Sequence, residues 1–201
     1  IPAAPQTDQR ESHPLDPALT MAQRSLQHIR SDIRDYTAVL AKRLRVNGKL
    51  NDYEHLLVKI RNRKTKDGVL TVPMGVYLRF IQPDSVKGRE VIWVEGKNNG
   101  KMIAHEGGFK GRFIPTVSLL PTSTIALRGN RYPITEIGIK TLTKRLIEKG
   151  TRDRKLGICK VRSINGAKVK DRVCTMLEVR HDDRKPQFDF HLARIFVDNE
   201  L

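Results

Sequence analysis

The sequence predicts an α+β fold, in which two amphipathic helices accompany an antiparallel sheet of about eight strands. Three observations lead to this prediction. Apolar residues recur at helical spacing over residues 15–33 and again over 139–147. In most of the remaining chain, apolar and polar residues alternate with a period of two, which is typical of a strand with one buried face. Turn sequences such as Asn47-Gly48 separate successive strands, so neighbouring strands are expected to pair as hairpins.

The chain is strongly basic. It has 201 residues, of which 38 are Lys or Arg and 22 are Asp or Glu, and its formal net charge is +16. A field of this sign attracts anionic partners such as nucleic acid, acidic lipid head groups or anionic polysaccharide, and it does not choose among them. No apolar run reaches the roughly 20 residues of a membrane span. Residues 1–13 lack the order of a signal peptide, and we expect them to be a flexible lead into a single domain over residues 14–201.

The first helix is expected to begin at Asp16, which is a good N-cap, with Pro17 as the first helical residue. Its apolar stripe must cover a surface, and the sheet that follows is the obvious one. The strands expected in that sheet lie at 36–46, 55–61, 72–80, 89–95 and 101–105.

A long irregular connection, rich in Gly and Pro, is expected from residue 107 to the second helix. Connections of this length are uncommon in compact domains and are often functional. The second helix is expected over residues 135–149, with Gly150 as its stop. The sheet is then expected to resume with strands at 157–164, 172–180 and 188–197.

The most apolar and most regular stretch is the hairpin over residues 72–96, which we place at the centre of the sheet. Its apolar face is the predicted ligand-binding cleft, formed by Met74, Val76, Leu78, Phe80, Val91 and Trp93. Two interpretations stay open. Either the two helices seal this face as an ordinary core, or the cover is incomplete and leaves a hydrophobic cleft for a lipid or an apolar peptide.

The two cysteines, Cys159 and Cys174, lie on strands that are expected to pair. If Asn165-Gly166 is the hairpin turn, Cys174 lies on the same face as Cys159, one pair along the diagonal. A diagonal distance of about 7–8 Å is slightly long for a disulfide, and a bulge at residues 170–172 would close the gap. A disulfide and two buried free thiols are both compatible with this pattern.

Two motifs could carry chemistry, and each has a simpler structural interpretation. His105 and Glu106 are adjacent on a strand, so their side chains point to opposite faces, which argues against an acid–base pair. The glycines and cations of residues 107–112 could cradle a phosphate, but the strand–GxxxxGK[ST]–helix pattern of a P-loop is missing. We therefore predict no catalytic residue and no enzymatic activity.

A metal site is also considered near the end of the chain. Asp189 and His191 share a strand face and could bind a metal with a ligand from the preceding segment, His181, Asp182 or Asp183. A zinc site needs three or four converging ligands, and only two are placed, so we predict no metal and no cofactor. Arg194 shares its face with several phenylalanines, and we expect it to pair with Glu178 on the neighbouring strand.

A basic cluster lies in the turn after the second strand, at Arg61, Arg63, Lys64 and Lys66, and more cations precede it at Lys42, Arg43 and Arg45. A surface that binds single-stranded nucleic acid would also need aromatic side chains for stacking. Aromatic residues make up only 5% of the chain, so a solvated or membrane-facing basic surface is favoured over a nucleic-acid site.

Six segments together resemble a bacterial family of unknown function, domain of unknown function 1571. They are HPLDPAL at 13–19, RDYTAVLAKR at 34–43, VKGREVIWVEG at 86–96, IAHEGG at 103–108, RYPITEIGI at 131–139 and FDFHLARIF at 188–196. The order of elements also resembles the lipoprotein-carrier architecture of LolA, LolB and RseB. That second resemblance implies a curved, half-barrel sheet covered by helices, whose concave face holds acyl chains or a peptide.

The resemblance also implies a cellular role. Members of the family look exported and continue past the segment DNEL at 198–201 into further strands, so we expect a periplasmic or otherwise exported protein whose signal peptide has been removed. The expected function is non-enzymatic binding of a lipid or a lipoprotein acyl chain, with a basic surface that approaches anionic membrane or wall polymer. The alternative is a structural or interaction protein that binds a protein or an anionic polysaccharide through that surface, and a hydrolase is a third, less favoured one.

Overall fold

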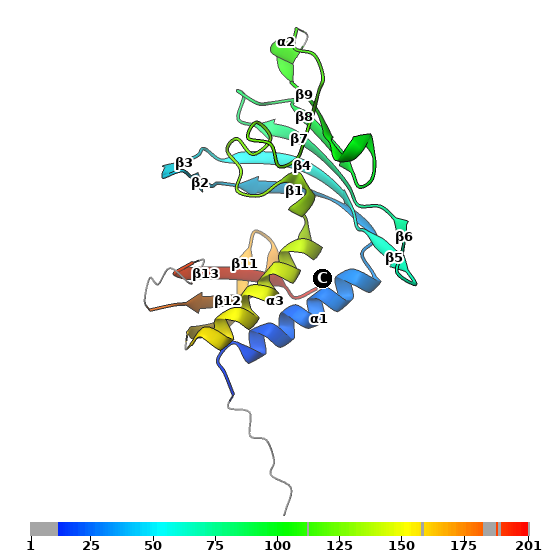
Figure 1. The fold of residues 1–201 in the computed structure, drawn as a ribbon. Helices are drawn as coiled ribbons and strands as arrows, with labels where there is room; N and C mark the ends of the chain where they lie inside the picture. Colours follow the sequence, from blue (N-terminus) through cyan, green and yellow to red (C-terminus); the bar gives the residue numbers. More distant parts are fainter. Residues whose placement is uncertain (1–11, 112, 158, 183–187, 189, 201) are drawn as a thin grey trace, which may run out of the picture. The chain divides into compact units, whose positions relative to one another are not determined.

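The computed structural model describes residues 12–111, 113–157, 159–182, 188 and 190–200 (Figure 1). The chain forms two compact units: a central unit, Leu26–Leu142, and a terminal unit made of Ile1–Ser25 and Thr143–Leu201. The fold is α+β, as predicted, with long helices and antiparallel sheets. No described helix combines the length and the apolar content that crossing a membrane requires.

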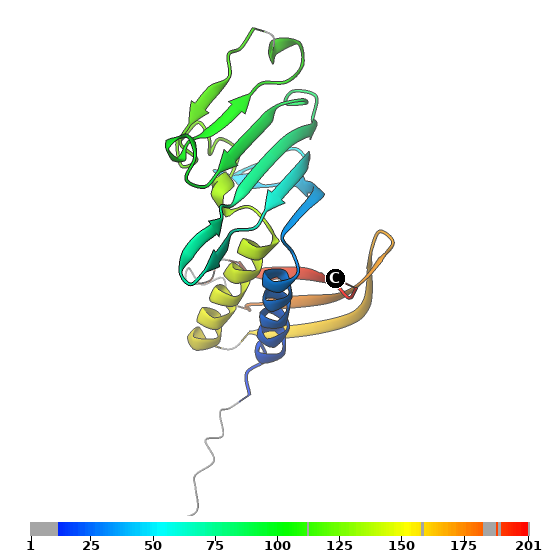
Figure 2. The ribbon, with the colours of Figure 1, turned by 90° about the vertical axis from the view of Figure 1, so that its right-hand side faces the viewer.

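The central unit is built on an open six-stranded antiparallel sheet with the order β1-β4-β7-β8-β9-β10 (Figures 1 and 2). Its strands are β1 (Asp35–Lys42), β4 (Glu54–Arg61), β7 (Gly75–Gln82), β8 (Glu90–Val94), β9 (Met102–His105) and β10 (Val117–Leu119). Two small hairpins project from it, β2 (Arg45–Val46) with β3 (Lys49–Leu50) and β5 (Lys64–Lys66) with β6 (Val69–Val72). The predicted Asn47-Gly48 turn is confirmed, with positive φ at both residues.

Alternation along these strands gives the sheet one buried face. Register places Val58 opposite Leu78, Leu78 opposite Val91, and Val91 opposite Ala104, so side chains from four strands meet in one row. The buried core of the unit consists of Leu56, Val58, Ile60, Val76, Leu78, Phe80, Val91 and Met102. Side chains on the opposite face, such as Ile92 and Ile103, are exposed.

The long connection covers this face. It contains α2 (Gly108–Gly111), the edge strand β10 and the short 3₁₀ helix η2 (Ile134–Glu136), and another 3₁₀ turn, η1 (Asn98–Gly100), precedes β9. Leu119, Ala126, Ile134 and Ile137 pack against the buried core. The segment that composition marked only as irregular therefore supplies the hydrophobic cover of the sheet.

The terminal unit contains a three-stranded antiparallel sheet of β11 (Lys160–Val169), β12 (Arg172–Arg180) and β13 (Leu192–Asp198). The first part of α1 (Asp16–Ser31) belongs to this unit, as does most of α3 (Ile139–Leu156). Leu15, just before α1, is buried with Cys159 and Val179, and Leu19 packs against this cluster. The predicted start of the first helix at Asp16 is confirmed.

The sequence predicts one sheet of about eight strands, but the strands that the structure describes form two larger sheets, of six and of three strands, and two small hairpins. Among the described strands, β10 is the edge of the larger sheet, and β11 pairs only with β12. Leu15 and Leu19, at the start of the first helix, pack on the three-stranded sheet. Alternation of apolar and polar residues identifies strands and their buried faces, but it does not say which strands pair across a long connection.

The lead over residues 1–13 lies mostly outside the described residues, and the single domain over 14–201 stays a prediction.

The second helix runs over Ile139–Leu156, so the expected range of 135–149 is displaced. Its start is delayed because Gly138 has φ 116, which is not helical, and the Tyr36 hydroxyl then accepts the Ile139 N–H at 2.9 Å. Gly150 lies inside the helix and does not stop it. A Cβ at Gly150 would lie 2.9 Å from Leu19 Cδ2, so this glycine leaves room for close packing against α1.

The hairpin of β11 and β12 turns at Lys170-Asp171, where Lys170 has φ 53. The expected turn at Asn165-Gly166 is wrong, because register shifts there and the two residues form an irregularity within β11. Cys174 faces Ala167, eight positions along the chain from Cys159. At about 3.3 Å per residue the two sulfurs are far apart, and both cysteines are buried free thiols. Of the two alternatives that the sequence left open, the structure has the free thiols.

Candidate functional site

The strongest candidate site is a cavity of about 610 Å³ over the buried face of the six-stranded sheet. Its volume is typical of ligand pockets, which span roughly 300–1,000 Å³. All six strands contribute to its floor, which consists of Leu40, Leu56, Leu78, Phe80, Val91, Met102, Ala104, Val117 and Leu119. The floor is apolar because these residues occupy alternate positions that register brings to one face.

The wall of the cavity comes from the connection between β10 and α3. Pro121, Ala126, Ile134 and Ile137 add apolar surface, and Ile125 lines the cavity while 71% of its surface is exposed. An apolar side chain that is both lining and exposed marks a place where the cavity opens to solvent. Within the described residues, neither α1 nor α3 contributes to the lining.

Three of the six predicted cleft residues, Leu78, Phe80 and Val91, line this cavity. The other three belong to the same hydrophobic core without lining it: Val76 is buried, and Met74 and Trp93 pack against the core. The pattern identified the correct face of the sheet. It could not find the wall, because residues 121–137 have no periodicity that would connect them to the sheet.

Charged groups also line the cavity. Arg89 and Glu106 form an ion pair at 2.9 Å, and the Arg89 guanidinium also lies over the Phe80 ring. Lys42 Nζ contacts Glu54 at 2.7 Å and donates a hydrogen bond to Asn130 Oδ1. The Asn51 side chain donates to the Gly129 carbonyl at 3.3 Å. The contacts to Asn130 and Gly129 fasten the connection to the β1 edge of the sheet.

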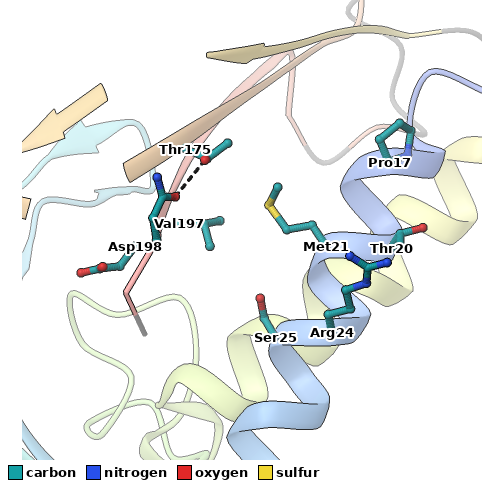
Figure 3. Close-up of a pocket in the computed structure, with 9 residues that line it drawn as sticks. Pro17, Thr20, Met21, Arg24, Ser25, Thr175, Val197 and Asp198 are labelled. Carbon is teal, nitrogen blue, oxygen red and sulfur yellow. Dashed lines mark hydrogen bonds between the residues drawn. The ribbon is translucent and has the colours of Figure 1, made fainter. Parts of the chain in front are cut away.

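A second cavity, of about 500 Å³, lies within the terminal unit (Figure 3). Met21 and Ser25 of α1 are on one side and Thr175 and Val197 on the other. Thr175 Oγ1 donates a hydrogen bond to Asn199 Oδ1 at 2.8 Å. The lining is smaller and more mixed than that of the sheet cavity, so this cavity is the weaker candidate.

Sequence reasoning missed a buried polar cluster in the terminal unit. Asp153 on α3 and His181 after β12 are each only 1% exposed, and His181 Nε2 lies 3.3 Å from Asp153 Oδ2. The ring of Phe188 stacks on His181 with centroids 3.8 Å apart. Burial, together with the charge of Asp153, raises the pKa of the Cys159 thiol. A protonated and enclosed thiol is a poor nucleophile, so this cluster has the character of a structural core.

The motifs considered for chemistry have separate partners. His105 Nδ1 lies 3.1 Å from Thr116 Oγ1, whereas Glu106 pairs with Arg89, so the two do not act together. Residues 108–111 form the short helix α2, and Arg112 lies outside the described residues.

The residues considered for a metal site are also dispersed. Asp183 and Asp189 lie outside the described residues, and Asp182 is bound by Lys160 at 2.7 Å, which lowers its pKa. Across the described chain, no group of three or more His, Cys, Asp or Glu side chains is placed to hold a metal. The predicted pair of Arg194 and Glu178 is confirmed, with Nε and Oε2 2.7 Å apart.

The basic cluster after β4 is partly neutralised. Arg63 forms an ion pair with Glu95 at 2.8 Å, and Arg61 donates to the Pro73 carbonyl. Burial opposes ionisation of Glu95, but hydrogen bonds from the Met74 N–H and from Arg63 outweigh it and lower the Glu95 pKa. Of these contacts, the ion pair with Glu95 offsets the charge of Arg63, whereas Arg61 keeps its charge.

Comparison with known proteins gives one family and several remote structural likenesses. No curated protein matches the chain. Among solved structures, a DUF1329 family protein from Desulfovibrio piger has 13% identity and a TM-score of 0.40, covering 94% of this chain and 70% of that one. A putative outer membrane lipoprotein-sorting protein domain from Vibrio parahaemolyticus has 10% identity and a TM-score of 0.41, covering 89% and 66%.

A third solved structure, a LolA superfamily protein from Nitrosomonas europaea, has 10% identity and a TM-score of 0.33, and the match covers 90% of this chain and 66% of that one. The chain therefore spans about two thirds of the length of these proteins. The family comparison is more direct. The model of a family described as a protein of unknown function, DUF1571, matches residues 33–201, and the chain belongs to that family.

Proposed function

We propose that this protein is a non-enzymatic binding protein that holds an apolar ligand, a lipid or a lipoprotein acyl chain, in the cavity of its six-stranded sheet. The observation that carries the proposal is the cavity itself, whose floor is apolar across all six strands. An ordinary sealed core would leave no such volume, because protein interiors are close-packed. The opening beside Ile125 gives a ligand a route of entry.

The setting we propose is the bacterial envelope, reached by export. The net charge of +16 supports this setting, because it would draw the protein toward anionic membrane or wall polymer. The paired cations of the basic cluster, such as Arg63 with Glu95, make a nucleic-acid partner the weaker choice. A lipidated protein fits the same cavity as a free lipid, since both present an alkyl chain.

The test fills the cavity with a side chain. Ala104 of β9 lines the cavity, and its neighbour Ile103 is exposed on the opposite face of the same strand. We expect Ala104→Phe to weaken binding of the neutral fluorescent probe N-phenyl-1-naphthylamine by about tenfold or more, and Ile103→Phe to leave it unchanged. Native mass spectrometry of the wild-type protein should show a co-purifying lipid, and Ala104→Phe should lose it.

Two results would contradict the proposal. One is a wild-type protein that carries no lipid and binds no probe. The other is binding that survives Ala104→Phe and falls steeply with salt, which would point to the basic surface as the binding site.

A further inference from the structure

The charges around the sheet cavity are unequal, and they indicate what kind of ligand it takes. Four cations and two carboxylates line it: Lys42, Arg89, Arg128 and Arg131 against Glu106 and Glu136. Glu54, outside the lining, offsets the charge of Lys42, so the net charge at the cavity is +1. An apolar cavity that bound only neutral hydrocarbon would gain nothing from this excess. The excess of positive charge at the cavity therefore points to a ligand that has a negative charge.

Two of the four lining cations form ion pairs with carboxylates, and two do not. Near β8 and β9, Arg89 is matched by Glu106 at 2.9 Å. Near β1, Lys42 is matched by Glu54. Arg131 donates from Nε and Nη2 to the Arg45 carbonyl, at 3.0 and 2.8 Å, and a carbonyl has no charge to offset a guanidinium. Arg128 is exposed and forms no ion pair with a described residue.

The two uncompensated arginines lie together at the β1 side. They are three residues apart in the connection, and the contacts of Gly129 and Asn130 with Asn51 and Lys42 hold this part of the chain against the sheet edge. The Arg131 guanidinium is itself held in the same place, because its Nε and Nη2 both donate to the Arg45 carbonyl. The Arg131 guanidinium is thus held beside the apolar floor, with Arg128 three residues away, and neither forms an ion pair with a carboxylate of the described residues.

We propose that the ligand is an amphiphile with an anionic head group, which Arg128 and Arg131 bind at the β1 side while the apolar chain lies across the floor toward β10. This proposal rests on the proposed function of the cavity. A charged head group is too costly to bury in the apolar floor, so it must stay at the opening. Guanidinium groups bind the oxygens of carboxylates and phosphates, which makes these the head groups expected here. Arg128 can supply the paired hydrogen bonds, whereas Nε and Nη2 of Arg131 donate to the Arg45 carbonyl and leave its Nη1 and its charge for the ligand.

The experiment compares three ligands that share a chain and differ in the head group. Palmitate, hexadecyl phosphate and hexadecanol are each used to displace N-phenyl-1-naphthylamine from the full chain. We expect palmitate or hexadecyl phosphate to bind about tenfold or more tightly than hexadecanol, and the better of the two identifies the head group. Arg128→Gln/Arg131→Gln should abolish the difference.

The matched control removes the same two charges elsewhere. Lys59→Gln/Arg79→Gln changes residues whose side chains alternate with the buried positions of β4 and β7, and it should keep the preference for the anionic ligands. If loss of the Arg45 contact unfolds the double variant, Arg128→Gln alone should still reduce the preference, because Arg128 has no ion pair to lose.

The outcomes separate the two proposals. If the wild-type protein binds the neutral probe but treats hexadecanol and both anions alike, the head-group proposal is wrong and the apolar cavity stands. If the control variant loses the preference as fully as the arginine variant, the effect comes from the net charge and the assignment to Arg128 and Arg131 is wrong. If the probe does not bind at all, the proposed function itself fails.

Discussion

At the scale of single residues, Asp16 has a role beyond the one that its position in the sequence indicates. The sequence predicts a helix N-cap, and the helix does begin there. Its carboxylate, however, accepts hydrogen bonds from Arg154 at 2.6 and 3.2 Å and from the His13 N–H at 2.9 Å. The hydrogen bond from Arg154, followed by that from His13, lowers the pKa of Asp16 from 3.8 to about 2. Asp16 therefore ties the start of α1 to the end of α3.

The contribution of Asp16 to the stability of the fold depends on pH. The pKa of Asp16 is lower in the folded protein, so its contribution to stability is complete above about pH 4 and is lost as the pH falls toward 2. We expect Arg154→Gln to raise the Asp16 pKa toward 3.8, as measured by NMR titration of the side-chain carboxyl. Arg24→Gln, which changes an exposed arginine on the same helix, should leave it low. An Asp16 pKa that does not respond to Arg154→Gln would contradict this account.

Gly107 is a second residue whose role is seen only in the structure. The neighbouring Gly108 has a positive φ, which favours glycine there, and Gly107 does not. At Gly107 the constraint is space, because a Cβ there would lie 2.1 Å from Gly88 C and 2.3 Å from the Lys87 carbonyl oxygen. Two backbone segments cross at this point, and neither can yield as a flexible side chain would.

We expect Gly107→Ala to lower the free energy of unfolding by about 3 kcal/mol, measured by chemical denaturation. Gly75→Ala is the matched control, because its Cβ would meet only the Arg61 guanidinium at an ordinary 3.5 Å. Equal effects of the two substitutions would show that the backbone crossing is not what Gly107 provides.

At the scale of elements, the hairpin of β11 and β12 shows how one turn decides the chemistry of distant residues. Asn-Gly is a strong turn signal, yet the chain turns five residues later, at Lys170-Asp171. The alternative register would have brought Cys159 and Cys174 near each other. The register that forms instead buries each thiol separately, Cys159 beside Leu15 and Val179, and Cys174 opposite Ala167.

The separation of the cysteines predicts their reactivity. We expect the intact mass of the protein to be the same with and without reductant, and both thiols to resist alkylation until denaturant is added. The raised pKa of Cys159 acts in the same direction, because burial disfavours the thiolate that would react. A mass that increases on reduction would show that the register is wrong.

At the scale of the whole molecule, the two units have separate hydrophobic cores. That of the central unit lies on one face of the six-stranded sheet, and that of the terminal unit surrounds Leu15, Cys159 and Val179. The core of the central unit contains a cavity, so the stability of this unit depends on the core residues that are fully packed. Ile60, which is 3% exposed and lies outside the cavity lining, is one of these.

We expect Ile60→Ala to lower the free energy of unfolding by about 3 kcal/mol, because it removes buried methylene groups and leaves a void. Ile92→Ala on the exposed face of β8 should change it by less than about 1 kcal/mol. Urea titrations followed by the fluorescence of Trp93, which packs against the core, report both values. If the two substitutions cost the same, the sheet does not have the two unequal faces described above.

Much of the candidate site could be predicted from the sequence, and the reason is local. Alternation along residues 72–94 fixes which side chains share a face, because successive side chains of a strand point in opposite directions. That rule identified Leu78, Phe80 and Val91 as residues of the apolar floor. The helix start at Asp16 and the turn at Asn47-Gly48 are local in the same way, since each depends on a few neighbouring dihedral angles.

What only the tertiary structure decided is which distant segments meet. The wall at residues 121–137, the pairing of Asp153 with His181, and the uncompensated arginines at the β1 side all join parts of the chain that no periodicity connects. The division of the strands into two sheets belongs here too, because strand pairing is a choice among partners with similar patterns. The sequence by itself determined an apolar sheet face and a basic chain, and folding determined that a cavity remains over that face with positive charge at one side.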